Sequence, residues 1–166
     1  MRIEHHLVPE NPIEDTSHQN SVELRLVFPC TQSNVRLALA SVMAGLGAMN
    51  LSEDDNSSIE IVLAEVLNNV TEHAYHDEGV GMIELQLKQT QSGLSCRVID
   101  TGDAMPRNVP PAGNPPNPDC PLEHQPEGGF GWFLIRHLTR DLAYMRQKDR
   151  NILSFRIEVG QSISRN

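Results

Sequence analysis

Aromatic residues are scarce in this sequence, which has one Trp, two Tyr and four Phe among its 166 residues. Hydrophobic residues nevertheless make up 39% of the chain, so we expect one domain with a largely aliphatic core. Cysteine is also rare, and Cys30, Cys96 and Cys120 lie far apart with no CxxC pair. This spacing excludes a disulfide framework and a cysteine-rich metal site, and it predicts a reducing compartment.

Basic residues are few, since 13 Lys and Arg against 22 Asp and Glu give a net charge of -9. A phosphate backbone attracts basic surfaces, so we expect no direct binding to nucleic acid. Long apolar runs are missing as well, because the longest, residues 37–49, is too short to cross a bilayer. Residues 1–20 lack the apolar segment of a signal peptide and predict a mobile N-terminal tail. Together these absences predict a cytoplasmic protein that contacts no membrane.

The pattern of apolar residues predicts a succession of strands and helices. Alternation with a period of two, as in residues 22–28, is typical of a half-buried strand, and helical spacing marks the longer segments. Ser33 is expected to cap the first helix, and the acidic residues 52–55 are expected to start the second. The expected order is strand 22–28, helix 33–49, helix 52–75, strands 83–87 and 94–98, helix 132–138, and strands 142–147 and 152–159.

Strands grouped in hairpins, with helices between them, predict an α/β (α+β) sandwich. Its sheet is expected to be mixed and mainly antiparallel, with helices covering one face. We expect this domain to span residues 21–160 and to be followed by a C-terminal tail over residues 161–166. Residues 106–126 hold eight of the eleven prolines and predict a long loop that is either functional or disordered.

Polar residues gather on one face of the second expected helix. Glu65 and Asn69 are four residues apart, so they share a face with Asn68 and Glu72, opposite the apolar stripe. An amide oxygen together with nucleotide phosphates would suffice for Mg²⁺, and a neighbouring carboxylate could deprotonate a hydroxyl group that attacks the γ-phosphate. The alternative is an ordinary solvated face of an amphipathic helix.

Two further segments have the chemistry to bind a nucleotide. Asp100 ends a buried strand before a glycine turn, and its carboxylate could accept a hydrogen bond from an exocyclic amine such as N6 of adenine. The glycines in residues 128–131 precede a helix, where the backbone can approach a phosphate closely. Each segment has a simpler alternative, which is a strand-ending turn for the first and a flexible loop end for the second.

The order and spacing of these segments resemble the GHKL (Bergerat-fold) ATPases, and specifically the anti-sigma-factor serine/threonine kinase group. The N-box of that family, Glu-x-x-x-Asn-x-x-x-His, is matched by Glu65, Asn69 and His73. Its Asp-x-Gly-x-Gly box is matched by residues 100–104, except that Ala104 stands where the second glycine is usual. A direct role for His73 and a purely local one are both open.

The second half of the chain continues the resemblance. The family's glycine box is matched by residues 128–135, and its variable ATP lid would span about residues 103–127. A hydroxyl residue of the last strand lies near adenine in the family, and Ser154 matches it. In the expected lid, Arg107 is the only Lys or Arg between Pro106 and Pro126, whereas Arg136 is expected to be a surface residue of the last helix.

The resemblance implies a role for each matched residue, with ATP and Mg²⁺ as cofactors. Glu65 would be the catalytic base and Asn69 the magnesium ligand. Asp100 would bind N6 of adenine, and Gly102 would let the backbone pass the base. The other implied nucleotide-binding positions are Ala104, Gly128, Gly129, Phe130, Gly131 and Ser154.

Two functions follow from the resemblance. The first is an anti-sigma factor with protein serine/threonine kinase activity, a homodimer that phosphorylates an anti-anti-sigma antagonist and sequesters a sigma factor. The second is a non-catalytic GHKL module that only sequesters a regulatory partner. Glu65 favours the kinase, because binding alone requires no base. Ala104 and the weakly basic loop favour the binding module, since a Cβ at Ala104 restricts positive φ.

Overall fold

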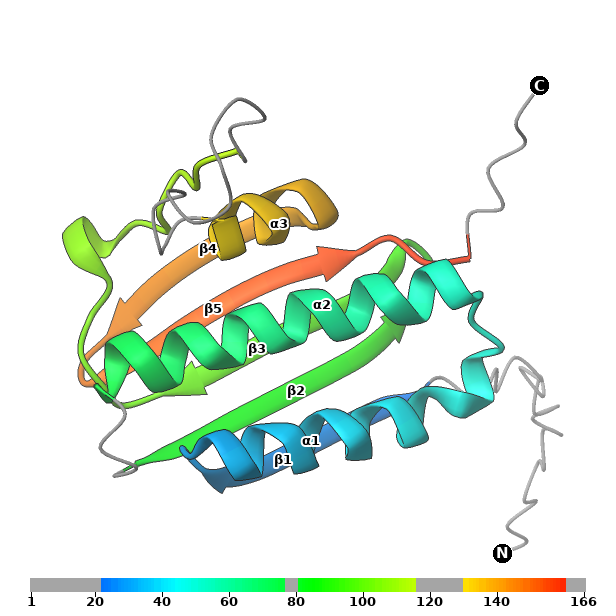
Figure 1. The fold of residues 1–166 in the computed structure, drawn as a ribbon, viewed down its shortest axis with the longest axis horizontal. Coiled ribbons are helices and arrows are strands. Elements are labelled where there is room, and N and C mark those ends of the chain that lie inside the picture. The colour runs from blue at the N-terminus through cyan, green and yellow to red at the C-terminus, as the bar shows by residue number, and fades with distance from the viewer. Residues whose placement is uncertain (1–21, 77–80, 116–129, 161–166) are drawn as a thin grey trace, which may run out of the picture.

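The computed structural model describes residues 22–76, 81–115 and 130–160. Its five strands form one sheet in the order β1-β2-β3-β5-β4, and every pairing between them is antiparallel (Figure 1). The strands are β1 (Glu23–Pro29), β2 (Met82–Thr90), β3 (Gly93–Asp100), β4 (Arg140–Gln147) and β5 (Arg150–Ile157). The helices are α1 (Gln32–Gly45), α2 (Glu53–Asn69) and α3 (Phe130–Leu138).

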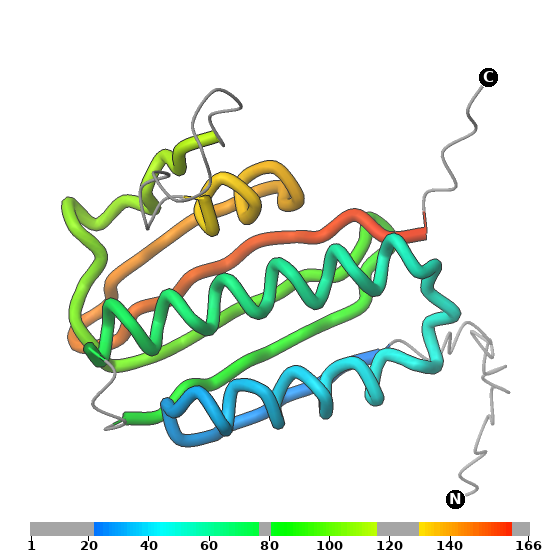
Figure 2. Tube along the Cα trace, in the orientation of Figure 1, coloured from blue at the N-terminus to red at the C-terminus, as the bar shows by residue number. Residues whose placement is uncertain are grey.

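The three helices lie on the same side of the sheet, as the tube in Figure 2 also shows. The predicted sandwich with one covered face is therefore confirmed, and the described sheet is antiparallel throughout. The predicted order of elements is also confirmed, and the strands and α3 end within a few residues of their expected bounds. The helices α1 and α2 end earlier than expected, at Gly45 and Asn69, and each is followed by a short turn. The expected tails, residues 1–20 and 161–166, lie outside the described residues.

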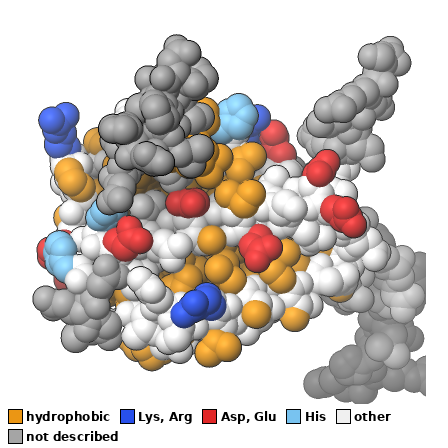
Figure 3. Space-filling view, viewed as in Figure 1, with side chains coloured by type: hydrophobic (Ala, Val, Ile, Leu, Met, Phe, Trp, Pro, Cys, Tyr) orange, Lys and Arg blue, Asp and Glu red, His pale blue; other side chains and the backbone are white. Residues whose placement is uncertain are grey.

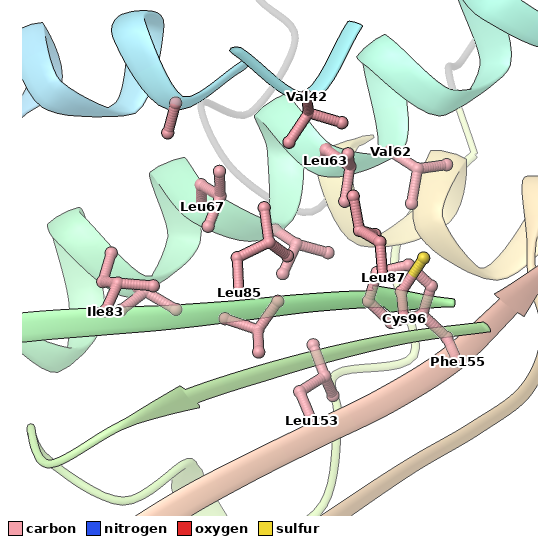
Figure 4. Close-up of a cluster of buried hydrophobic side chains, with 14 of the residues drawn as sticks. Val42, Val62, Leu63, Leu67, Ile83, Leu85, Leu87, Cys96, Leu153 and Phe155 are labelled. Carbon is pink, nitrogen blue, oxygen red and sulfur yellow. The ribbon is translucent and has the colours of Figure 1, made fainter. Parts of the chain in front are cut away.

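The core lies between the helices and the covered face of the sheet. Alternate residues of the central strands point into it, as Leu85, Leu87 and Cys96 show, and each of these is at most 1% exposed. Figure 4 shows them facing aliphatic side chains of α1 and α2, including Val42, Leu63 and Leu67. Of the labelled side chains only Phe155 is aromatic, which agrees with the expected aliphatic core.

Local sequence determines where α1 and α2 begin. Ser52 caps α2 and exchanges hydrogen bonds with Asp55 in a capping box, which confirms the expected acidic start. Ser33 does not cap α1, because the cap is Thr31, whose hydroxyl oxygen accepts a hydrogen bond from the backbone N–H of Asn34. Thr31 has the extended backbone that a cap needs, whereas Ser33 is already inside the helix.

Short irregular turns end both long helices. After α1 a 3-10 turn, η1 (Leu46–Met49), completes the helical segment that was predicted as one helix. After α2 the chain widens into a π-helical turn, η2 (Val70–Ala74), in which the N–H of Tyr75 donates to the carbonyl of Val70. Such turns often occur beside functional sites.

The helical face carries acidic side chains along α2 and few basic ones, with hydrophobic side chains between α2 and α1 (Figure 3). Leu37 on α1 and Ile61 on α2 are 66% and 41% exposed. Among the described residues, none of the helices combines the length and the hydrophobicity that a bilayer crossing requires.

Candidate functional site

A cavity of about 530 Å³ opens at the end of α2, between η2, the end of β3, the loop that follows β3, and α3. Its volume falls in the range of small-molecule sites. Val66, Val98, Trp132 and Leu153 are among the apolar residues of its wall. Polar residues of the wall come from the end of α2, η2, β3, the loop after β3, β4 and β5. The polar and ionisable lining residues are Asn69, His73, His76, Asp100, Asp103, Tyr144 and Asn151.

Asp100 is the most enclosed ionisable group of the cavity, with 6% of the residue exposed. Its Oδ1 accepts hydrogen bonds from Asn151 Nδ2 at 2.7 Å and from the backbone N–H of Gly102 at 2.9 Å. Burial raises the pKa of Asp100, although these two bonds and the charge of Arg146 oppose the rise. Both bonds go to Oδ1, and no described residue forms a hydrogen bond with Oδ2, which is therefore left as an acceptor for a ligand.

Three residues that the sequence did not single out hold this carboxylate in place. Asn151 lies directly opposite Asp100 in the register of β3 and β5, and its Nδ2 also donates to the carbonyls of Gly102 and Asp103. Its Oδ1 accepts from Tyr144 Oη at 2.7 Å and from an Arg146 Nη at 2.6 Å. Asn151 is therefore saturated by protein groups, and it positions Asp100 and the turn after β3.

Ser154 does not line the cavity, contrary to the expectation from the resemblance. Asn151, Leu153 and Phe155 are buried on the covered face, and successive strand residues alternate between faces, so Ser154 lies on the opposite face. Its hydroxyl is within 3.5 Å of the carbonyl of Ala143 on β4. The alternation in residues 151–157 was a signal that could have identified Asn151 instead.

Glu65 lies on α2 one turn before Asn69 and packs against the start of α3. A Cβ added at Gly131 would overlap Glu65 Oε2, so this glycine is required for the carboxylate to lie there. Desolvation by burial raises the pKa of Glu65, and repulsion from Glu72 raises it further. A carboxylate with a raised pKa is a stronger base than an ordinary one.

Asn69 lines the cavity, and its Nδ2 is buried without a hydrogen-bond partner among the described residues. A buried amide is costly when unpaired, so this group is suited to a ligand that occupies the cavity. His73 lies one turn later and also lines the cavity. The N-box residues Asn69 and His73 thus meet the residues around Asp100 in one site.

The glycine and the alanine of the expected Asp-x-Gly-x-Gly box lie in different surroundings. A Cβ at Gly102 would overlap the carbonyl oxygen of Ala74, which accepts a hydrogen bond from the N–H of Asp103 at 2.9 Å. Gly102 thus permits close packing against η2 and does not itself line the cavity. Ala104 does line it, and it is not among the described residues with positive φ, so its backbone has no need of glycine.

The structure describes residues 130–135 of the expected glycine box. Gly128 and Gly129 lie outside the described residues, as do residues 116–127 of the expected lid. Phe130 is 46% exposed, its ring stacks on Phe133 with centroids 6.1 Å apart, and it is not among the residues that line the cavity. Gly131 lies against the carboxylate of Glu65.

Alanine substitutions at Gly131 and Gly102 should distinguish the roles of these two glycines. Gly131→Ala places a Cβ against the flexible end of the Glu65 side chain, so we expect a displaced carboxylate and an unchanged free energy of unfolding. Gly102→Ala presses on backbone at Ala74, so we expect a loss of roughly 1–3 kcal/mol in the free energy of unfolding. Denaturant unfolding of both variants checks this, and equal losses would contradict it.

Comparison with known proteins agrees with this geometry. Residues 28–157 match the family described as histidine kinase-like ATPase domain (HATPase_c_2). The serine-protein kinase RsbW of Bacillus thuringiensis (strain Al Hakam) is 29% identical over 120 residues, which cover 72% of this chain and 72% of that protein. The serine-protein kinase RsbW of Bacillus cereus (strain AH820) shows the same identity and coverage.

A solved structure shares the fold. The crystal structure of the RsbU and RsbW domains of Rv1364c from Mycobacterium tuberculosis aligns with a TM-score of 0.57 at 16% identity, over 82% of this chain and 32% of that chain. The present chain thus corresponds to about a third of that structure. Because the family match extends over residues 28–157, the chain belongs to the histidine kinase-like ATPase domain family.

Proposed function

We propose that this protein is a Mg-ATP-dependent protein serine/threonine kinase and anti-sigma factor. The observation that carries the proposal is the placement of Glu65, with its raised pKa, one helical turn from Asn69, which lines the cavity together with Asp100. A site that only bound a nucleotide would have no use for a base beside it. Serine-protein kinases among the relatives support the same reaction class.

Different residues of the cavity would bind different parts of the nucleotide. Asp100 presents Oδ2 as an acceptor for the exocyclic amine of adenine, held by Asn151 and the N–H of Gly102. Val66, Trp132 and Leu153 provide apolar surface for the base. Asn69 would offer Oδ1, a hard oxygen ligand, to Mg²⁺. Its buried Nδ2, which has no hydrogen-bond partner among the described residues, would donate to a phosphate oxygen. When bound, Mg²⁺ would neutralise charge on the phosphates.

Glu65 acts on the protein substrate. Its carboxylate accepts the proton of the attacking serine or threonine hydroxyl as that oxygen bonds to the γ-phosphorus and ADP leaves. The lack of a Cβ at Gly131 leaves room for the carboxylate beside the start of α3. Since burial and Glu72 raise the pKa of Glu65, the group holds the transferred proton more strongly than an exposed glutamate would.

The substrate proposed for this kinase is an anti-anti-sigma protein. The second proposed partner is a sigma factor, which this protein would sequester. We propose that it acts as a homodimer in the cytoplasm. A non-catalytic module that sequesters a regulatory partner is the second candidate. It is favoured by the described part of the loop after β3, residues 101–115, where Arg107 is the one cationic side chain and lies outside the cavity lining.

Phosphate transfer to purified anti-anti-sigma proteins from the source organism tests the proposal. Each candidate is incubated with this protein, ATP and Mg²⁺, and intact-mass spectrometry records the addition of one phosphoryl group. We expect a phosphoserine or phosphothreonine on at least one candidate, and none when the kinase is omitted. Complex formation with a candidate, but no phosphoryl transfer to any of them, would favour the binding module.

A further inference from the structure

The loop after β3 is held against α3 over residues 105–115, here named the strap. Figure 2 shows it rising from the end of β3 and running to α3. The strap contains Pro106, Pro110, Pro111 and Pro115, which have no backbone N–H to donate. The carbonyls of Met105 and Pro106 accept the N–H groups of Asn108 and Val109 in a 3-10 turn, η3 (Pro106–Asn108). The carbonyls of Pro110 and Pro111 have no such backbone donor among the described residues.

Arg136 on α3 supplies those donors. Its Nε donates to the carbonyl of Pro111 and its Nη2 to the carbonyl of Pro110, each at 2.7 Å. Two N–H groups of one planar guanidinium thus bind two consecutive carbonyls, an arrangement that the single ammonium of a lysine cannot reproduce. Arg136 is exposed, as expected from the sequence, but it has a specific task that the sequence did not reveal.

The strap has two other attachments. At its start, the N–H of Met105 donates to Tyr144 Oη at 3.1 Å. Near its end, Gly113 has a φ of 77°, and a Cβ there would overlap the backbone nitrogen of Phe133 on α3. The bonds from Arg136 lie between these two points, where the strap forms part of the cavity wall.

Pro106 and Pro111 of the strap line the cavity, whereas Arg136 does not. We propose that Arg136 is a positioning residue, whose guanidinium fixes Pro110 and Pro111 and so holds the strap as a wall of the cavity. The expected effect on ATP rests on the function proposed above, while the effect on the strap itself does not. Without Arg136 the carbonyls of Pro110 and Pro111 would form hydrogen bonds with water, and the strap would move between closed and open positions.

Trypsin provides a direct readout of the strap, because Arg107 is exposed within it. In this protein, Arg136→Met removes the donors, and Arg136→Lys keeps the positive charge but lacks the two N–H groups of a planar guanidinium. For both variants we expect cleavage after Arg107 to be about tenfold faster than in the wild type, since cleavage follows the population of the open form. Arg140→Met is the matched control, because Arg140 also binds carbonyls, those of His137 and Thr139, and does not contact the strap.

The second readout is the steady-state kinetics of ATP use. For Arg136→Met we expect the KM for ATP to rise about tenfold with kcat within about threefold, because a mobile wall weakens nucleotide binding and leaves Glu65 untouched. Gly113→Ala, which strains the strap at another point, should produce the same faster cleavage after Arg107.

Cleavage of both Arg136 variants at the wild-type rate would overturn the proposal. So would an equal acceleration in Arg140→Met, which would indicate general destabilisation. If the wild type neither bound nor used ATP, the proposed function would fail, yet the cleavage rates would still decide whether Arg136 holds the strap. Cleavage of Arg136→Lys after Arg107 at the wild-type rate would contradict the requirement for a guanidinium that donates to two carbonyls at once.

Discussion

Replacing Glu65 with Gln should lower the rate of phosphate transfer by about 10²–10⁴-fold, the usual contribution of a general base. Gln keeps the size of the side chain and loses the ability to take up a proton. Binding of ATP should stay within about threefold of the wild type, because Glu65 is beside the cavity and is not among its lining residues. Transfer is measured by mass spectrometry and binding by calorimetry.

The same substitution should not destabilise the protein. The folded-state pKa of Glu65 is raised, mainly by burial and then by Glu72, so ionisation of this group opposes folding as the pH rises through that pKa. At pH values well above it, Glu65→Gln should therefore unfold at the same temperature as the wild type or higher. The advantage should shrink as the pH falls and the wild-type carboxyl becomes protonated.

Glu60→Gln is the matched control, since Glu60 is an exposed glutamate earlier on α2. It should leave both transfer and binding unchanged. A transfer rate in Glu65→Gln equal to that of the wild type would refute the role of Glu65 as the base. A lower unfolding temperature for Glu65→Gln at neutral pH would indicate a structural role instead.

Replacing Asp100 with Asn should reduce ATP affinity by about 10–100-fold, which corresponds to the roughly 1–3 kcal/mol cost of a buried unpaired donor. The new carbonyl oxygen can still accept from Asn151 and Gly102 in place of Oδ1. The amide NH₂ then takes the position of Oδ2 and faces the exocyclic amine of adenine, donor against donor. The change thus preserves the local hydrogen bonds and reverses the group offered to the base.

Inosine triphosphate makes this test specific, because its base carries a carbonyl where adenine has the amine. Asp100→Asn should bind it more tightly than the wild type does, while binding ATP more weakly. Unfolding by denaturant checks that the variant is folded. If Asp100→Asn weakened both nucleotides equally, Asp100 would have a structural role and not the recognition of adenine proposed here.

The sequence allowed the layers of the fold to be predicted because its signals are local. Apolar periodicity marked each strand and helix, and residues 52–55 marked the start of α2. The cap of α1 was misplaced by two residues, since Thr31 and Ser33 are both acceptable capping residues and only the backbone conformation distinguishes them.

The site was predictable in part, for the same reason. The spacing of Glu65, Asn69 and Asp100 is visible in the sequence; Asn69 and Asp100 line one cavity, and Glu65 lies one helical turn from Asn69. The partners of Asp100 were not predictable from spacing, because Asn151 and Arg146 come from strands more than 40 residues later and meet it only through the sheet register. The bonds from Arg136 to Pro110 and Pro111 are equally non-local.

The most direct test of the central claim, that the cavity at the end of α2 binds Mg-ATP, is calorimetric titration of the wild type with ATP in the presence and absence of Mg²⁺. Trp132 lines the cavity and is 7% exposed, so its fluorescence gives an independent readout of the same event. We expect saturable binding with a dissociation constant on the order of micromolar, weakened strongly when Mg²⁺ is removed. Folded protein that shows neither heat nor a fluorescence change up to about millimolar ATP would contradict the assignment of this cavity as a nucleotide site.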